Sequence, residues 1–185
     1  IMLLDIGGGS CEFAEGIEET ADLAASVPLG AGRMTLQFFH PNDPPGLEAV
    51  ERLRDHARDV LAPLAEQFRA LPKPDHIVGS SKAIRSLATL AGRKAPSIPS
   101  YDRVELSRDG LGAWIPRLAK IPALARQELP GITPDRTFQI VAAAVCLHTA
   151  MDVLKIDSLE VCPWALREGV LLRYIESLPW QGGGI

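Results

Sequence analysis

Residues 3–16 read "LLDIGGGSCEFAEG", and the fold can be argued outward from this stretch. An apolar run that contains Asp5 leads into three consecutive glycines, and an alternating segment that contains Glu12 follows. Glycine loses more backbone freedom on folding than any other residue, so three in a row weaken a strand or a helix. Close approach of the backbone to a bulky charged ligand is the usual reason for such a run. We therefore predict a β-hairpin whose glycine turn faces a ligand.

The chemistry around this turn suits a phosphate. Consecutive backbone N–H groups in a glycine turn form a concave anion site, so the candidate phosphate-binding residues are Gly7, Gly8, Gly9 and Ser10. Asp5 stands where the strand stops, and carboxylate oxygens are the ligands that Mg²⁺ prefers. Glu12 lies two residues beyond Ser10 and shares its strand face, from which it could reach a water beside the phosphate. Together these parts predict hydrolytic phosphoryl transfer; the alternative is a plain hairpin with two exposed acids.

Two common nucleotide-binding motifs do not fit the glycine run. No Gly-Lys-Ser/Thr follows, which excludes a P-loop. A strand rather than a helix comes next, which excludes the dinucleotide-binding fingerprint.

A second candidate anion site is "VGSSKAIRS", residues 78–86. A strand runs into Gly79, Ser80 and Ser81, and a helix begins there, so free N–H groups and the positive end of the helix dipole converge. Lys82 and Arg85 lie three residues apart on one helical face and would add positive charge. The alternative is an ordinary helix cap with two solvated cations.

The remaining chain alternates single strands with helices, which indicates an α/β fold with a mixed sheet and flanking helices. Strands are expected at residues 2–6, 12–16, 23–29, 76–79, 104–106 and 158–162, the first three as an antiparallel meander. Helices are expected to end at Phe39, to span 47–69 and to run from 81 to about 90. Further helices are expected after Ser107, from 134 to about 154, and over 164–178. A loop is expected at residues 92–103. Pro63 should bend or divide its helix. Thr133 should cap the helix that Pro134 begins, and His148 should be a hydrogen-bonded core residue.

Composition narrows the class of protein. The 185 residues suffice for one sizeable core, and a net charge of −4 does not favour a nucleic-acid binder. No apolar run approaches the ~20 residues that a membrane-spanning helix needs. The three cysteines are widely spaced without a CxxC pair, which favours reduced thiols in the cytoplasm over disulfides or a zinc site. Because a buried-looking strand begins at Ile1, we expect the chain to be cut from a longer protein.

Four stretches, in this order, resemble the exopolyphosphatase and guanosine pentaphosphate phosphohydrolase (Ppx/GppA) family of the actin-like ATPase superfamily. They are "DIGGGSCE" at 5–12, "GSSKAIRSLA" at 79–88, "LPGITPDR" at 129–136 and "ALREGVL" at 165–171. The first is shared across the superfamily, whereas LPGI…R and ALREG are more specific. In the last stretch, the adjacent Arg167 and Glu168 do not face each other on a helix, so one could point at a site; the alternative is an ordinary surface pair.

The resemblance implies a ribonuclease-H-like α/β domain, with residues 1–185 forming the second domain of a two-domain phosphatase. The first domain, with another phosphate loop of the type Asp-x-Gly-Ser-Asn and a further acid, does not occur in this sequence. By resemblance, Asp5 would contribute to Mg²⁺ binding and Glu12 would orient or deprotonate the attacking water. Residues 7–10 would hold terminal phosphate and residues 79–81 would line the cleft between the domains. As further anion contacts we expect Arg33, Lys82 and Arg85.

The sequence departs from the family pattern in two places. In the helix after "LPGITPDR" the family commonly has an Ala-Asp pair and a later Gly-Ala, whereas this chain has Thr-Phe-Gln at 137–139 and three alanines at 142–144. This puts a polar role of that helix face in doubt. Cys11 replaces a common Thr, which we interpret as a packing change.

Three functions remain open from the sequence. The first is release of terminal phosphate from inorganic polyphosphate or guanosine pentaphosphate by Mg²⁺-assisted attack of water, with this chain alone inactive. The second is an ATPase or sugar-kinase module, which would need a base aimed at a substrate hydroxyl rather than Glu12 beside a water. The third is a non-catalytic phosphate-binding domain. The expected partners are the substrate and the missing N-terminal domain, a homodimer through an exposed face being a further option, and neither nucleic acid nor a membrane.

Overall fold

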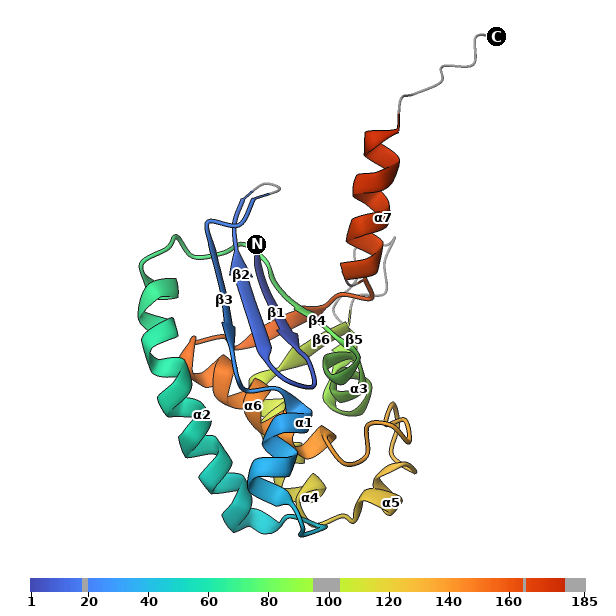
Figure 1. Cartoon of the computed structure of the whole chain (residues 1–185). Coiled ribbons are helices and arrows are strands. Elements are labelled where there is room, and N and C mark those ends of the chain that lie inside the picture. Colours follow the sequence, from blue (N-terminus) through green and yellow to red (C-terminus); the bar gives the residue numbers. More distant parts are fainter. Residues whose placement is uncertain (18–19, 95–103, 165, 179–185) are drawn as a thin grey trace, which may run out of the picture.

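One mixed sheet of seven strands organises the computed structural model, which describes residues 1–17, 20–94, 104–164 and 166–178 (Figure 1). The strand order is β3-β2-β1-β4-β7-β6-β5. The strands are β1 (Met2–Ile6), β2 (Cys11–Glu15), β3 (Leu23–Val27), β4 (Ile77–Ser80), β5 (Arg93–Lys94), β6 (Val104–Ser107) and β7 (Ser158–Val161). The predicted α/β class and mixed sheet are confirmed. Strand β5 lies in the segment predicted to be a loop, of which residues 95–103 are outside the described part.

Strands β1, β2 and β3 form the predicted antiparallel meander, with Asp5 opposite Glu12 and Glu12 opposite Ser26. Strand β4 runs parallel to β1 and places Ser80 beside Asp5. Strand β7 runs parallel to β4. Since parallel neighbours end at the same edge of a sheet, the ends of β1, β4 and β7 bring the two candidate anion sites together.

Alternation along β1 shows that helices cover one face of the sheet. Met2, Leu4 and Ile6 are buried, whereas Leu3 and Asp5 point to the opposite face and keep some exposure. The centre of the helical layer is α6 (Ile140–Val153). It packs against α1 (Ala31–Met34), α2 (Gly46–Arg69), α3 (Lys82–Ala91) and α4 (Arg108–Leu118). Asp5 therefore lies on the less covered face, where a ligand has access.

Helix α6 begins later than predicted. We expected a helix from Pro134 with Thr133 as its cap, but residues 134–139 form successive turns and the helix starts at Ile140. The Thr133 hydroxyl donates to the Asp135 carboxylate at 2.5 Å instead of accepting a hydrogen bond from the first helical turn. The predicted burial of the helix is confirmed, since nearly all of its side chains are shielded from solvent.

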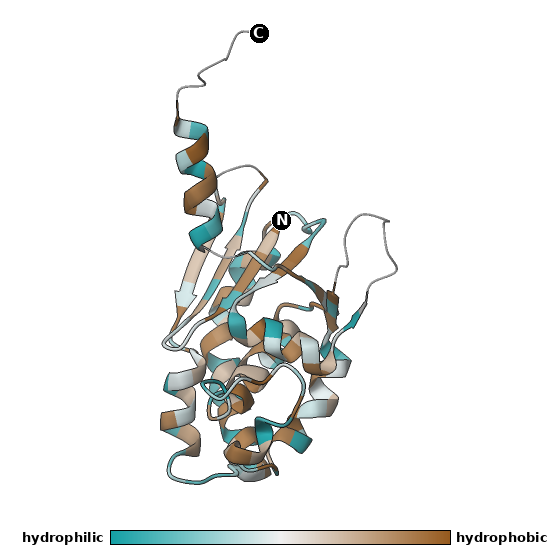
Figure 2. Ribbon diagram, turned by 90° about the vertical axis from the view of Figure 1, so that its right-hand side faces the viewer, coloured by the Kyte–Doolittle hydropathy of each residue, from teal (hydrophilic) through white to brown (hydrophobic). Residues whose placement is uncertain are grey.

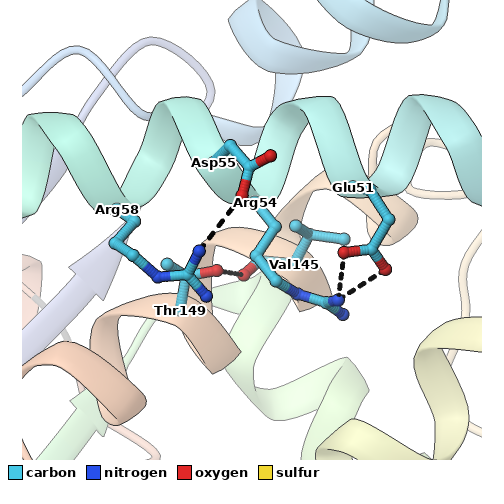
Figure 3. Close-up of polar contacts among 6 residues, drawn as sticks. All are labelled: Glu51, Arg54, Asp55, Arg58, Val145 and Thr149. Atoms are coloured by element: carbon cyan, nitrogen blue, oxygen red, sulfur yellow. Dashed lines mark hydrogen bonds and ion pairs between the residues drawn. The ribbon is translucent and has the colours of Figure 1, made fainter.

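Helix α2 (Gly46–Arg69) is one element, so of the two predicted effects of Pro63, a bend or a division, the division does not occur. Buried Leu61, Leu64 and Phe68 lie on both sides of the proline, and their packing offsets the hydrogen bond that proline cannot donate. Figure 3 shows α2 where it lies against α6, with Arg54 paired to Glu51 at 2.6 Å and Arg58 paired to Asp55 at 3.1 Å. Beneath them, on α6, the Thr149 hydroxyl donates to the carbonyl of Val145. Acids and bases three residues apart thus pair along this helix.

Two of the shorter helices begin with a serine cap. The helix predicted to end at Phe39 consists of α1 (Ala31–Met34) and a π-helical turn, η1 (Thr35–Phe39). Ser81 and Ser107 cap α3 (Lys82–Ala91) and α4 (Arg108–Leu118), each by accepting a backbone N–H at 3.1 Å. Helix α5 (Ala123–Arg126) was not predicted.

Helix α7 (Leu166–Ser177) projects away from the rest of the fold, as Figures 1 and 2 both show. Several of its large apolar side chains are exposed, Val170, Leu171, Tyr174 and Ile175 among them. Among the described residues, no helix combines the length and the apolar character needed to cross a bilayer.

Candidate active site

The glycine turn joins β1 to β2 and is held from one side by the start of α1. The carbonyls of Gly7 and Gly8 accept the N–H groups of Ala31 and Arg33, both at 2.9 Å. The carbonyl of Gly9 accepts the Arg33 Nε–H at 2.9 Å. No hydrogen bond among the described residues uses the N–H groups of Gly8 and Gly9. The carbonyls are therefore occupied, and the N–H groups of the turn remain available to an anion.

Space around the turn differs between its two sides. A Cβ added to Gly8 or Gly9 would meet no atom within 4 Å. A Cβ on Gly30 would instead lie 2.2–2.4 Å from backbone atoms of Gly9 and Ser10. The turn thus rests directly on Gly30 and is open toward the ligand side. Gly30 was not predicted to belong to the site; the signal in the sequence was a second pair of glycines, at 30 and 32, shortly after β3.

The two predicted acids lie on neighbouring strands. Glu12 is exposed, and its Oε1 accepts the Ser10 hydroxyl and, at 3.1 Å, the Ser26 hydroxyl. Ser10 and Glu12 therefore share a strand face as predicted, whereas Ser26 was missed because it belongs to another strand. The pKa of the half-buried Asp5 is raised by burial and by the charge of Glu12, while the Ser80 hydroxyl and Arg85 act in the opposite direction.

The β4–α3 turn lies beside Asp5. Ser80 is buried, and its hydroxyl donates to the carbonyl of Trp164 at 3.3 Å. Ser81 has a backbone φ of 134°, a conformation that residues other than glycine rarely adopt. Such residues tend to cluster at functional sites. Gly79 faces the core, because a Cβ there would lie 2.8 Å from Ile84 and Leu159. The need for packing space therefore explains Gly79, which was predicted to line the cleft.

The predicted cations lie on two sides of the turn. Arg33 contacts the carbonyl of Gly9 on the α1 side. Arg85 lies near enough to Asp5 to affect its pKa and donates to the carbonyl of Pro163 at 3.3 Å. Lys82 is exposed and helps to lower the pKa of Asp135, an effect dominated by the Thr133 hydroxyl. The structure thus places Arg33 at the glycine turn and Arg85 near Asp5. It places Lys82 near Asp135 instead.

The turns at 133–139 border the site, although sequence analysis treated them only as the start of a helix. The Arg136 Nε lies 3.3 Å from the Asp135 carboxylate, close enough for an ion pair. The contact does not have hydrogen-bond geometry, so this nitrogen has no hydrogen-bond partner. The Gln139 Oε1 lies 3.4 Å from the position of a Cβ on Gly32, which in turn lies 3.1 Å from the Gly8 carbonyl. The motif "LPGITPDR" marked this segment in the sequence. Its spacing did not show that the segment lies next to the glycine turn.

The chemistry of Asp5 and Glu12 fits part of a Mg²⁺ site. Burial and mutual repulsion raise the pKa of Asp5, and a bound cation would relieve that repulsion. Among the described residues, no group of three or more His, Cys, Asp or Glu side chains forms a closed metal cage. Mg²⁺ commonly uses one or two carboxylates together with substrate phosphates and waters. Asp5 is therefore the residue that would hold the ion here.

The sequence profile of the Ppx/GppA phosphatase family matches residues 1–178. The chain belongs to the Ppx/GppA phosphatase family. It is 44% identical over 179 residues to exopolyphosphatase 1 of Mycobacterium tuberculosis, covering 96% of this chain and 51% of that protein. Exopolyphosphatase 1 of Mycobacterium leprae is 41% identical over 177 residues, with 96% and 52% covered. This Ppx/GppA chain thus spans about half the length of the curated relatives that it matches.

Solved Ppx/GppA structures share the fold. The crystal structure of the Aquifex aeolicus family member superimposes with a TM-score of 0.79 at 27% identity, over 96% of this chain and 57% of that one. An exopolyphosphatase from Cytophaga hutchinsonii gives a TM-score of 0.78 at 22% identity, with the same shares covered. The actin-like fold and the family predicted from the sequence are confirmed.

Proposed function

We propose that the protein containing this chain releases terminal phosphate from inorganic polyphosphate by attack of water, and that this chain forms one wall of the active site. One observation carries the proposal. The Glu12 carboxylate is held by the Ser10 and Ser26 hydroxyls beside a turn whose Gly8 and Gly9 N–H groups are free to bind an anion. The names of the mycobacterial relatives support polyphosphate as the substrate class.

Each group then has one task. The N–H groups of Gly8 and Gly9 bind oxygens of the terminal phosphate, and Arg33 and Arg85 offset its charge. The Ser10 hydroxyl donates its one hydrogen to Glu12 and so positions that carboxylate. Glu12 orients a water and accepts its proton while the new P–O bond forms. The bridging P–O bond breaks, and the shortened chain leaves with the bonding electron pair. Mg²⁺ on Asp5 would supply charge neutralisation of the phosphate oxygens when it is bound.

The remainder of the protein is proposed to complete the site. This chain covers about half of its relatives, and α7 carries exposed apolar side chains that an adjoining surface would bury. We expect the other half to contribute a second phosphate loop and a further acid, so that this chain alone is inactive. Guanosine pentaphosphate is a second substrate to test, and a homodimer a second assembly. Three free cysteines support a reducing compartment such as the cytoplasm.

The test is Mg²⁺-dependent phosphate release from polyphosphate by the intact protein, with Glu12→Gln as the variant. Loss of a positioned general base should lower kcat by about 10²–10⁴-fold. Glu66→Gln, which changes an exposed acid on α2, is the matched control and should leave the rate unchanged. Equal rates for Glu12→Gln and the intact protein would contradict the role of Glu12. Phosphate transfer to a sugar instead of water would favour the kinase alternative.

A further inference from the structure

A cavity of about 350 Å³ lies at the end of the β1–β2 hairpin that is farthest from the glycine turn. Met2 and Glu15 pair where β1 begins and β2 ends, and both belong to its wall. The other walls come from the end of α2, the loop 71–74 and the residues that follow α6. At ~3.3 Å per residue, the strand from Met2 to Ile6 separates the cavity from the turn by about 13 Å. The cavity therefore does not belong to the candidate active site.

Glu15 is a buried acid without a partner in this cavity. It is 7% exposed, and it also lines a second cavity of about 160 Å³ that shares the loop 71–74 with the first. Among the described residues, no hydrogen bond or ion pair uses its carboxylate. Burial is the largest cause that raises the pKa of Glu15, and Asp22 adds to the rise, whereas the amino group of Ile1 opposes it. Because a buried carboxylate without a hydrogen bond is costly, a ligand that donates to Glu15 would offset that cost.

Unpaired cations lie at the rim of the same cavity. Arg69 and Lys73 line it and are exposed. In the described part of the chain, neither side chain makes a hydrogen bond or an ion pair. The Lys155 amino group, 3.9 Å from the Asp152 carboxylate, adds a further positive charge. Cations at the rim and the carboxylate of Glu15 inside suit a ligand that carries one charge of each sign.

The floor of the cavity is apolar, and one wall is preformed. Met2, Phe68 and Ile156 belong to the floor, and each is at most 7% exposed. The loop 71–74 reads Leu-Pro-Lys-Pro, so two prolines restrict its backbone. Its first residue donates its N–H to the carbonyl of Phe68 at 3.1 Å. Lys73 thus stands on a loop with little freedom, and little structure has to be ordered when a ligand enters.

We propose that this cavity binds a small apolar α-amino acid of the leucine type. Its ammonium group would donate to Glu15, its carboxylate would pair with Lys73 and Arg69, and its side chain would contact the apolar floor. About 350 Å³ is at the small end of ligand pockets, which favours a single amino acid over a longer peptide. Binding at this end of the hairpin does not depend on hydrolysis, so this proposal and the phosphohydrolase function can fail independently.

The test is a calorimetric titration of the intact protein with L-leucine, for which we expect saturable binding. Isocaproate is leucine without the amino group, and leucinamide has an amide in place of the carboxylate. Each should bind at least about tenfold more weakly than leucine, because one charge-assisted contact is lost. Glycine, which has no apolar side chain, should also bind more weakly. Absence of saturable leucine binding would overturn the proposal, as would binding by this chain but not by the intact protein.

Two variants test the two charged ends of the ligand separately. Glu15→Gln should weaken leucine binding at least about tenfold without weakening isocaproate, which has no ammonium group. Lys73→Gln should weaken leucine binding without weakening leucinamide, which has no carboxylate. Because Lys73 is exposed, its replacement leaves the packing intact, and this variant decides the test if Glu15→Gln fails to fold.

Two exposed residues that line neither cavity provide the matched controls. Glu128→Gln removes an acid and Lys120→Gln removes a base, and both variants should bind leucine as the unmodified protein does. Equal leucine affinities of Glu15→Gln and Glu128→Gln, or of Lys73→Gln and Lys120→Gln, would overturn the proposal.

Discussion

At the scale of single residues, the orientation of Glu12 depends on a side chain that sequence analysis did not select. Ser26 donates to Glu12 from the next strand at 3.1 Å. We expect Ser26→Ala in the intact protein to lower kcat for phosphate release by about tenfold, with KM nearly unchanged, because a hydrogen bond to a charged group contributes about 1.5 kcal/mol. Ser26→Thr retains the hydroxyl and should restore most of the rate. A change confined to KM would assign Ser26 to substrate binding instead.

Gly30 supports the glycine turn through its lack of a side chain. We expect Gly30→Ala to lower the free energy of unfolding by about 1–3 kcal/mol, because the added methyl group overlaps the backbone of Gly9 and Ser10. Gly8→Ala is the matched control, since its Cβ would face open space. Urea unfolding of the two variants of this chain measures the difference. If both variants unfold at the same urea concentration, the turn does not rest on Gly30 in the way described.

Among these residues, the sequence predicted the contacts between residues that are close together in the chain. The run from Asp5 to Glu12 carries its own turn, its acids and its strand period, so the hairpin and the shared face of Ser10 and Glu12 were predictable. Ser26, Gly30 and Gln139 reach the site by strand pairing and helix packing. No spacing in the sequence encodes such contacts.

At the scale of elements, boundaries were predicted well where a cap is local and poorly where tertiary packing decides. Ser81 and Ser107 cap their helices as their sequence contexts indicate. Thr133 and Pro134 have an equally good capping pattern, yet the chain makes turns there and α6 starts at Ile140. The bond from Arg126 to the carbonyl of Thr137 holds this segment in turns. Packing of its buried side chains likewise keeps α2 continuous through Pro63.

Helix α6 also carries His148, which was predicted to be a hydrogen-bonded core residue. That prediction is wrong for one of its nitrogens, because Nδ1 is buried and has no hydrogen-bond partner. Burial and the nearby Arg54 and Arg108 lower the pKa of His148 below 6.5, whereas Asp152 and Asp109 oppose the shift. The unfolded state therefore binds a proton that the folded state does not, and stability falls as the pH drops below about 6.5 toward the folded pKa.

We expect His148→Gln to reduce this pH dependence. The free energy of unfolding, measured at pH 7.5 and pH 5.5, should decrease less in the variant than in the unmodified chain. One proton limits the effect to about 1.4 kcal/mol per pH unit. His40→Gln, on the exposed loop after η1, is the matched control. An unchanged difference between the two pH values would show that His148 does not control stability there.

At the scale of the whole molecule, α7 projects away from the other helices and strands of the described residues (Figures 1 and 2). The helix was predicted from the sequence at 164–178 and observed at Leu166–Ser177. Its exposed apolar side chains include Val170, Leu171, Tyr174 and Ile175. Isolated helices shorter than about 12–15 residues are marginal in water, and most helical stability in proteins comes from packing of an apolar face. Helix α7 therefore requires a surface that the described residues do not provide.

We expect hydrogen exchange to distinguish α7 from α6. In this chain at low concentration, the amides of α7 should exchange far faster than those of the buried α6, because opening α7 exposes little additional apolar surface. In the intact protein, the same amides should become protected if the remaining half covers the helix. Protection that appears in this chain only as its concentration rises, together with a dimer in sedimentation, would identify a second copy as the partner. Protection of α7 in the dilute monomer would contradict both arrangements, since the helix would then be stable by itself.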